Sequence, residues 1–221
     1  MAKYTKHQDE KIIELYHKGV DYFNENKNRA YTVLTIIVVI IAAVFVYFRY
    51  QRSKNEEADN QLLKVQQLYF SGSYEQAING DSLGTTKGLI YIVDTYGGTE
   101  SGQTAKLMLA NCYYYLNDFD NALKYFKDFS GGNNFLKASS IAGIGAVNES
   151  KNEFLEAAKN YEKAANVGKE VPNNDEYLAN AIRNYFYAKD IENMKKIIAQ
   201  LKKDYPKSKF ISQVLRYDPV Q

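Results

Sequence analysis

Cysteine and histidine, two residue types that often carry chemistry, are scarce in this sequence. Cysteine occurs once, as Cys112, so the chain can form no internal disulfide and no thiolate-bound metal cluster by itself. The two histidines, His7 and His17, lie near the N-terminus, so the larger part of the chain lacks the commonest catalytic base. Cys112 stands within the helical pattern KLMLANCYYYL, where a small buried side chain is favoured over a reactive thiol.

Familiar catalytic and nucleotide-binding motifs are also missing. The sequence has no nucleophile elbow, no Walker-type loop and no zinc-binding spacing. GTTKG at residues 84–88 lacks the spacing of a phosphate loop, and GIG at residues 143–145 lies in a helical pattern, where close helix packing explains it better than a dinucleotide. We therefore expect no catalytic residue, no cofactor and no metal. An enzyme whose site matches no motif stays open as an alternative.

An excess of charge of one sign is absent as well. The chain carries 28 basic and 26 acidic side chains, which gives a formal net charge of +2. A dedicated nucleic-acid surface requires clustered Lys and Arg. So balanced a mixture argues against DNA or RNA as a partner.

What the sequence does contain is one long apolar run. Residues 31–48, YTVLTIIVVIIAAVFVYF, carry no charge, and 18 helical residues extend over about 27 Å, close to the hydrocarbon thickness of a bilayer. Thirty residues precede the run, and FVYFRY spans its end. A cleavable signal peptide has a shorter segment in front and ends in small residues. We predict a retained transmembrane anchor at residues 31–50, between an N-terminal segment at 1–30 and a domain at 51–221. Basic and tyrosine side chains flank the run, as interfacial anchoring requires: Lys27, Arg29, Tyr31, Tyr47, Arg49, Tyr50 and Arg52.

The N-terminal segment indicates an orientation and a surface helix. Its thirty residues carry six Lys or Arg, against four in the twenty residues after the run. By the positive-inside rule, this difference predicts a cytoplasmic N-terminus and an exported C-terminal domain. Apolar side chains at near-helical spacing predict an amphipathic helix: Ile12, Ile13, Tyr16, Val20 and Phe23. We favour a helix that rests against lipid headgroups over one that docks on a partner.

After the charged stretch RSKNEEADN, four similar turns recur: GSYEQAI, NDFDNAL, NEFLEAA and KDIENMK. Their small-residue positions are 45, 35 and 37 residues apart, and the last two steps fit a helix-turn-helix repeat of about 34 residues with short insertions. Gly72, Asn117 and Asn152 tolerate the left-handed backbone of a tight turn. Small side chains allow paired helices to approach closely. The aromatic and small positions are Tyr74, Phe119 and Phe154, and Ala77, Ala122, Ala157 and Met194.

This pattern resembles the tetratricopeptide-repeat superfamily over about residues 56–206, most closely at LANCYYYLNDFDNALKYFKDF, residues 109–129. The resemblance implies an all-α fold, in which a single N-terminal transmembrane helix is followed by a tetratricopeptide-like helical-hairpin solenoid. Because no hairpin can bury its apolar face alone, the hairpins are expected to stack. The first repeat departs from the pattern, since NGDSLGTTKG at residues 79–88 interrupts its second helix.

The order of parts, a cytoplasmic stub, one span, a charged linker and an exported repeat domain, resembles the ancillary subunit of the bacterial Sec translocon. That resemblance implies a single-pass protein of the bacterial inner membrane whose periplasmic domain assists protein export. Translocon subunits or periplasmic chaperones would then be its partners. The chain resembles, less closely, periplasmic repeat proteins of cell division and outer-membrane assembly. Self-association through the same scaffold stays open.

The repeat register predicts a concave surface formed by the first helices of the hairpins. Tyrosine offers a large contact area at low entropic cost, while Asn111 and Arg183 could hold a peptide backbone or a carboxylate. The alternative is that a neighbouring hairpin, or a C-terminal helix around residues 208–215, covers these side chains. The predicted partner-binding residues are Leu62, Gln66, Tyr69, Phe70, Leu107, Asn111, Tyr114, Tyr115, Glu149, Arg183, Phe186 and Tyr187.

Overall fold

The computed structural model describes the backbone of residues 2–217, and the side chains of residues 11–217 apart from Phe23 and Ala30. The described residues form helices and contain no strand, with one isolated bridge between Gly80 and Lys87. The chain divides into two compact units, Met1–Ser53 and Lys54–Gln221. The predicted all-α class is confirmed.

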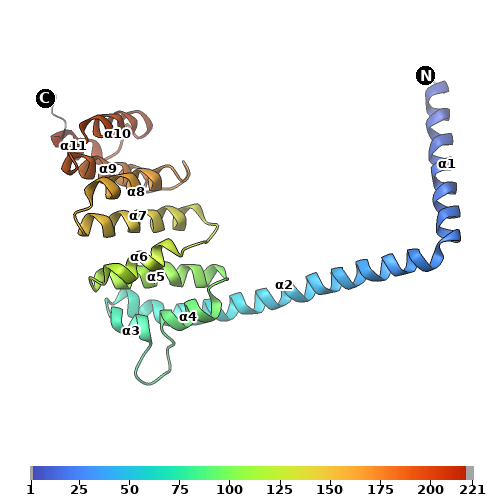
Figure 1. Ribbon diagram of the computed structural model, residues 1–221, viewed down its shortest axis with the longest axis horizontal. Coiled ribbons are helices and arrows are strands. Elements are labelled where there is room, and N and C mark those ends of the chain that lie inside the picture. The colour runs from blue at the N-terminus through green and yellow to red at the C-terminus, as the bar shows by residue number, and fades with distance from the viewer. Residues whose placement is uncertain (1, 218–221) are drawn as a thin grey trace. The chain divides into compact units, whose positions relative to one another are not determined.

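The first unit contains α1 (Ala2–Glu25) and the beginning of α2 (Lys27–Phe70), drawn in blue in Figure 1. Among the described residues, α2 is the one helix that is long and apolar enough to cross a membrane, by length and composition. The protein buries none of its most apolar stretch. The helix predicted before the run is present as α1, on which Ile12 and Tyr16 are exposed. The side chain of Phe23 lies outside the described side chains.

The charged stretch RSKNEEADN, expected as a linker, is helical and lies inside α2. It contains neither glycine nor proline, and its Lys, Glu and Ala residues favour helix. From Lys54 onward the helix belongs to the second unit, where Ala58, Leu62 and Val65 are buried. The linker prediction is therefore wrong, and the end of α2 serves as the first helix of the first repeat.

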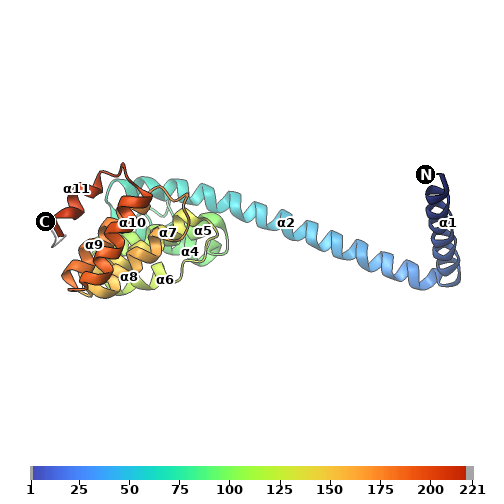
Figure 2. The same cartoon turned by 90° about the horizontal axis from the view of Figure 1, so that it is seen from above.

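The second unit is a stack of helical hairpins, in which helices that follow one another in sequence lie side by side (Figures 1 and 2). The pairs α5 with α6, α7 with α8 and α9 with α10 form complete hairpins. The first hairpin consists of the end of α2 and its partner helix, which a loop divides into α3 and α4. This loop confirms the predicted interruption at residues 79–88. The elements are α3 (Tyr74–Asn79), α4 (Leu89–Tyr96), α5 (Glu100–Tyr115), α6 (Phe119–Lys127), α7 (Asn134–Ser150), α8 (Phe154–Ala165), α9 (Asn174–Tyr187), α10 (Ile191–Asp204), α11 (Phe210–Val214) and the 3-10 helix η1 (Leu215–Tyr217).

Each hairpin turns at one residue with a left-handed backbone. In the second hairpin the amide of Asn117 donates to the carbonyl of Tyr114 at 3.0 Å, and the amide of Asp118 donates to the carbonyl of Tyr113 at 2.9 Å. The same two bonds recur at the other three turns, where they satisfy carbonyl groups at the end of the first helix. The left-handed turns predicted in the first three hairpins are confirmed. The turn residues and their φ angles are Gly72 (78°), Asn117 (61°), Asn152 (61°) and Lys189 (60°).

Small side chains lie where the paired helices approach each other. On α7, a Cβ added to Gly145 would meet the Tyr161 ring at 3.2 Å, and one added to Gly143 would come within 2.3 Å of the Phe126 ring. The GIG sequence therefore allows close helix packing, as predicted. The small positions of the second helices are all fully buried: Ala77, Ala122, Ala157 and Met194.

The hydrophobic core runs through the stack. Cys112 is buried between the first two hairpins, and burial raises the pKa of its thiol to about 12. A thiol with so high a pKa stays protonated and unreactive near neutral pH, which agrees with the structural role expected for it. At the other end α11 and η1 pack on α9, where Val214 is buried together with Leu178 and Ile182.

Of the four turn residues, Lys189 is the least suited to a left-handed backbone, because glycine and asparagine adopt it more readily. We expect Lys189→Gly to raise the free energy of unfolding of residues 54–221 by about 1 kcal/mol, since glycine has no Cβ to strain. Denaturant unfolding followed by circular dichroism measures the change. Lys195→Gly, inside α10, is the control and should cost about 1 kcal/mol. Equal destabilisation by both substitutions would contradict the role assigned to the turn.

Candidate protein-binding surface

The predicted site residues lie on the first helices α2, α5, α7 and α9, but they do not share one environment. Leu62 and Leu107 are only 6% and 7% exposed and pack within the hydrophobic core. Leu62 lies one turn after Ala58 on the buried face of α2. A partner cannot reach these two leucines, so they do not belong to a binding surface in this structure. Gln66 is half-buried on α2.

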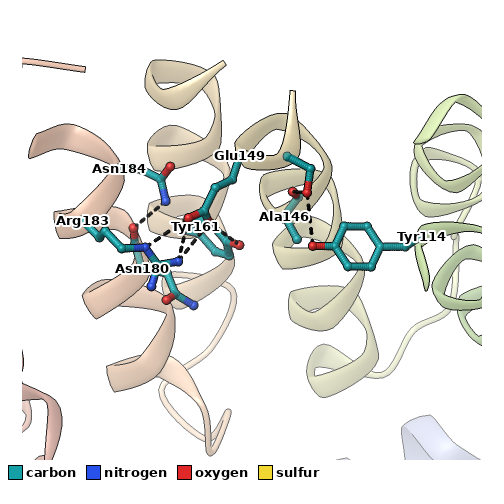
Figure 3. A network of polar contacts seen from close by, with 8 residues as sticks. Tyr114, Ala146, Glu149, Tyr161, Asn180, Arg183 and Asn184 are labelled. Atoms are coloured by element: carbon teal, nitrogen blue, oxygen red, sulfur yellow. Dashed lines mark hydrogen bonds and ion pairs between the residues drawn. The ribbon is translucent and has the colours of Figure 1, made fainter. Parts of the chain in front are cut away.

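Glu149 and Arg183 bind each other rather than presenting their charges to solvent (Figure 3). The Arg183 Nε donates to Glu149 Oε1 at 3.1 Å, and Nη2 donates to Oε2 at 2.9 Å. The Tyr161 hydroxyl also donates to Oε2, at 3.2 Å. Burial and the Glu149 charge raise the pKa of Tyr161. Burial alone would lower the pKa of Arg183, but the bonds to Glu149 outweigh this effect, and the pKa of Arg183 is raised. Arg183 therefore joins α9 to α7, and its guanidinium is already engaged by a carboxylate.

Other predicted polar side chains also join neighbouring repeats. The Asn111 amide donates to the Tyr69 hydroxyl at 3.3 Å, which links α5 to α2. The Tyr114 hydroxyl lies 3.2 Å from Ser150 Oγ, and Ser150 in turn donates to the Ala146 carbonyl at 3.0 Å, so the tyrosine is the donor (Figure 3). Burial raises the pKa of the Tyr69 phenol, although the bond from Asn111 acts to lower it. These side chains hold the repeats in register.

Aromatic rings follow one another along the turn ends of the first two hairpins. Tyr74 of the first hairpin stacks on Tyr115 of the second, with ring centroids 4.9 Å apart. Phe70 is 77% exposed and Tyr115 is 55% exposed, so the rings form a continuous surface that solvent reaches. We call this surface the aromatic strip, and its members are Tyr69, Phe70, Tyr74, Tyr114, Tyr115 and Phe119.

A second aromatic group lies at the turn end of the last two hairpins. Tyr187 contacts Phe154 of the preceding hairpin at 5.3 Å between ring centroids. Phe186 contacts Tyr217 of η1 at 5.0 Å. A neighbouring hairpin and Tyr217 of the C-terminal segment thus contact these rings without covering them, and Phe186 and Tyr187 remain 38% and 49% exposed.

Sequence reasoning named Tyr74 and Phe119 as aromatic residues of the turns but did not assign them to the surface. Each begins a second helix, two residues after the left-handed turn residue. The turn therefore brings each ring to the end of the hairpin where Tyr69 and Tyr114 also lie. Their recurrence at equal distance from the turn is the signal that could have placed them there.

Stacked helical hairpins with exposed aromatic rings define the class of helical-repeat scaffolds for protein–protein interaction. The family model of the tetratricopeptide repeat-like domain matches residues 21–144, more than half of the chain, and the protein belongs to this family. Proteins of this family are typically scaffolds rather than enzymes. No curated protein matches the chain. Within the described part of the chain, no group of His, Cys, Asp and Glu is placed to hold a metal ion.

The ion pair between Glu149 and Arg183 gives a stability prediction for the repeat unit. Its side chains are 25% and 29% exposed, so the charge-assisted bonds are less screened than those of a surface pair. We expect a double-mutant cycle with Glu149→Gln and Arg183→Met to give a coupling free energy of about 1 to 2 kcal/mol in thermal unfolding. The pair of Glu156 and Lys159 on α8, whose side chains are more than half exposed, is the control and should give less than about 0.5 kcal/mol. Similar coupling in the two pairs would refute a special role for Arg183.

Proposed function

We propose that this protein is a membrane-anchored scaffold whose repeat domain binds a protein partner through the aromatic strip. The observation that carries the proposal is the exposure of Phe70 and Tyr115 within a continuous set of rings. Large aromatic side chains are enriched in the centres of protein interfaces, where burying them contributes most of the binding free energy. Tyr115 stacks on Tyr74, and a ring that is already held in place loses less entropy when a partner binds.

Membrane anchoring rests on the apolar run of α2. Its side chains have no cover within the protein, and exposing them to water would be unfavourable, whereas a bilayer would bury them. The basic and tyrosine side chains at both ends suit the two interfaces. The exposed apolar side chains of α1, among them Ile12 and Tyr16, suit a helix lying at the headgroups. The charge difference favours a cytoplasmic N-terminus, and the resemblance to the translocon subunit favours a periplasmic repeat domain at a bacterial inner membrane.

The order of parts favours a role beside the Sec translocon, with translocon subunits or periplasmic chaperones as partners. Envelope assembly, cell division and self-association are the alternatives, because each would use the same scaffold. An enzyme is less favoured, because the half-buried charges Glu149 and Arg183 are bonded to each other and Tyr161 donates to Glu149.

The orientation predicts which side of the membrane exposes the repeat domain. Protease added to spheroplasts should digest residues 54–221, because a periplasmic domain is accessible from outside. Immunoblots against the C-terminal and N-terminal ends would follow the cleavage, with a cytoplasmic protein as control for intact cells. Digestion that requires permeabilised cells would show that the orientation is the reverse.

The aromatic strip predicts a loss of partner capture without a loss of folding. Phe70→Ala together with Tyr115→Ala should reduce crosslinking of partners in native membranes by at least about tenfold, as expected when interface anchors are removed. Crosslinked proteins are identified by mass spectrometry, and thermal unfolding checks the fold. The matched control is Phe135→Ala, which removes an aromatic side chain near the start of α7, outside the strip. Phe135 is 45% exposed, close to the 55% of Tyr115. Unchanged capture would exclude the strip as the contact surface, and a collapse of stability would assign its rings to the core.

A further inference from the structure

A groove with a volume of about 800 Å³ opens between the second helices of the middle two hairpins. Side chains of α6 and α8 line its sides, and α7, which contacts both helices, contributes a row of residues between them. The volume lies within the range of ligand pockets, about 300 to 1,000 Å³. Its apolar lining consists of Leu123, Phe126, Phe129, Ile141 and Ile144.

The charges of the groove are divided between its two ends. Lys127 ends α6, Lys137 lies in the first turn of α7 and Lys163 in the last turn of α8. Because neighbouring helices run in opposite directions, these three lysines meet at one end of the groove. None of them has an ion-pair partner among the described residues. Glu153 and Glu156 lie at the other end, and Glu156 is paired with Lys159 at 2.7 Å.

Asn148 supplies a polar group inside this groove. It lines the groove from α7 and is 7% exposed. A side-chain amide offers two N–H donors and a carbonyl acceptor, so it can bond to a ligand that has both a donor and an acceptor. A peptide backbone offers an N–H and a C=O at each residue. Asn148 lies one turn beyond Ile144, so it would meet the backbone next to the apolar lining.

We propose that this groove binds an extended peptide segment of a protein partner. Apolar side chains of the peptide would contact Ile141 and Ile144, its backbone would bond to the Asn148 amide, and an acidic side chain or a C-terminal carboxylate would lie among the three lysines. The site is separate from the aromatic strip, since the groove is lined by α6, α7 and α8 and shares no residue with the strip. The inference rests on the proposed scaffold function but not on the strip.

The test uses the full chain purified in a non-ionic detergent and two fluorescent peptides. One peptide carries two leucines followed by two aspartates and a free C-terminal carboxylate, and the other carries lysines in place of the aspartates and an amidated C-terminus. Fluorescence anisotropy should show the acidic peptide bound at least about tenfold more tightly, because unlike charges attract and like charges repel. This preference should weaken at high salt.

Variants then locate the site. Lys137→Glu and Lys163→Glu should each weaken binding of the acidic peptide about tenfold, and Asn148→Leu should do the same by removing the backbone contact. Lys202→Glu, in the last turn of α10, is the matched control for Lys163→Glu and should leave binding unchanged. Lys137 is exposed, so its substitution decides the question even if Asn148→Leu unfolds.

Each other outcome would overturn the proposal. Equal binding of both peptides, binding of neither, or binding unaffected by Lys137→Glu and Lys163→Glu would exclude a polarised peptide groove. A change of sedimentation coefficient with Lys137→Glu, without peptide binding, would assign the groove to a second copy of the chain. Phe70→Ala with Tyr115→Ala should keep peptide binding, so failure of the groove and failure of the aromatic strip can be told apart.

Discussion

The left-handed turn residue of each hairpin fixes the position of the side chains around it. It ends the first helix, starts the second two residues later, and turns the chain within a few residues. The residues two positions before and two positions after it must therefore lie at the same end of the stack. In the first two hairpins those positions hold Phe70 with Tyr74 and Tyr115 with Phe119. The aromatic strip is thus a consequence of backbone geometry, repeated with aromatic residues at the same positions.

In the third hairpin, polar residues replace the aromatic residues that come just before the turn in the second hairpin. At the positions where the second hairpin has Tyr114 and Tyr115, the third has Glu149 and Ser150. Glu149 binds Arg183 of the next hairpin and Ser150 accepts from Tyr114 of the preceding one. Polar contacts therefore hold the middle of the stack in register, and they divide the aromatic rings into the strip and the group around Phe186. A scaffold gains from such bonds because they are directional, whereas apolar contacts between helices permit sliding.

The two proposed contact surfaces differ in the kind of partner they suit. The aromatic strip is exposed and nearly without charge, which suits a folded surface that can bury rings such as Phe70. The groove carries lysines at one end and is lined by the Asn148 amide, which suits an extended chain with an acidic end. A protein with both surfaces could hold a partner domain and a segment of chain at the same time. With the apolar run of α2 in a bilayer, both contacts would occur at the membrane, where local concentration raises the occupancy of weak sites.

The sequence by itself determined the features that depend on local interactions. The apolar run, the turns at Gly72, Asn117 and Asn152, and the interruption of the first repeat were predictable because backbone preference and periodicity act within a few residues. The sequence did not show that one helix, α2, continues from the apolar run into the first repeat. The charged stretch between them suggested a linker, but its residues are good helix formers. Only the tertiary structure decided which face of each first helix is covered. Leu62 is buried, Arg183 is paired with Glu149, and Asn148 lines a groove, because each outcome depends on contacts between helices distant in sequence.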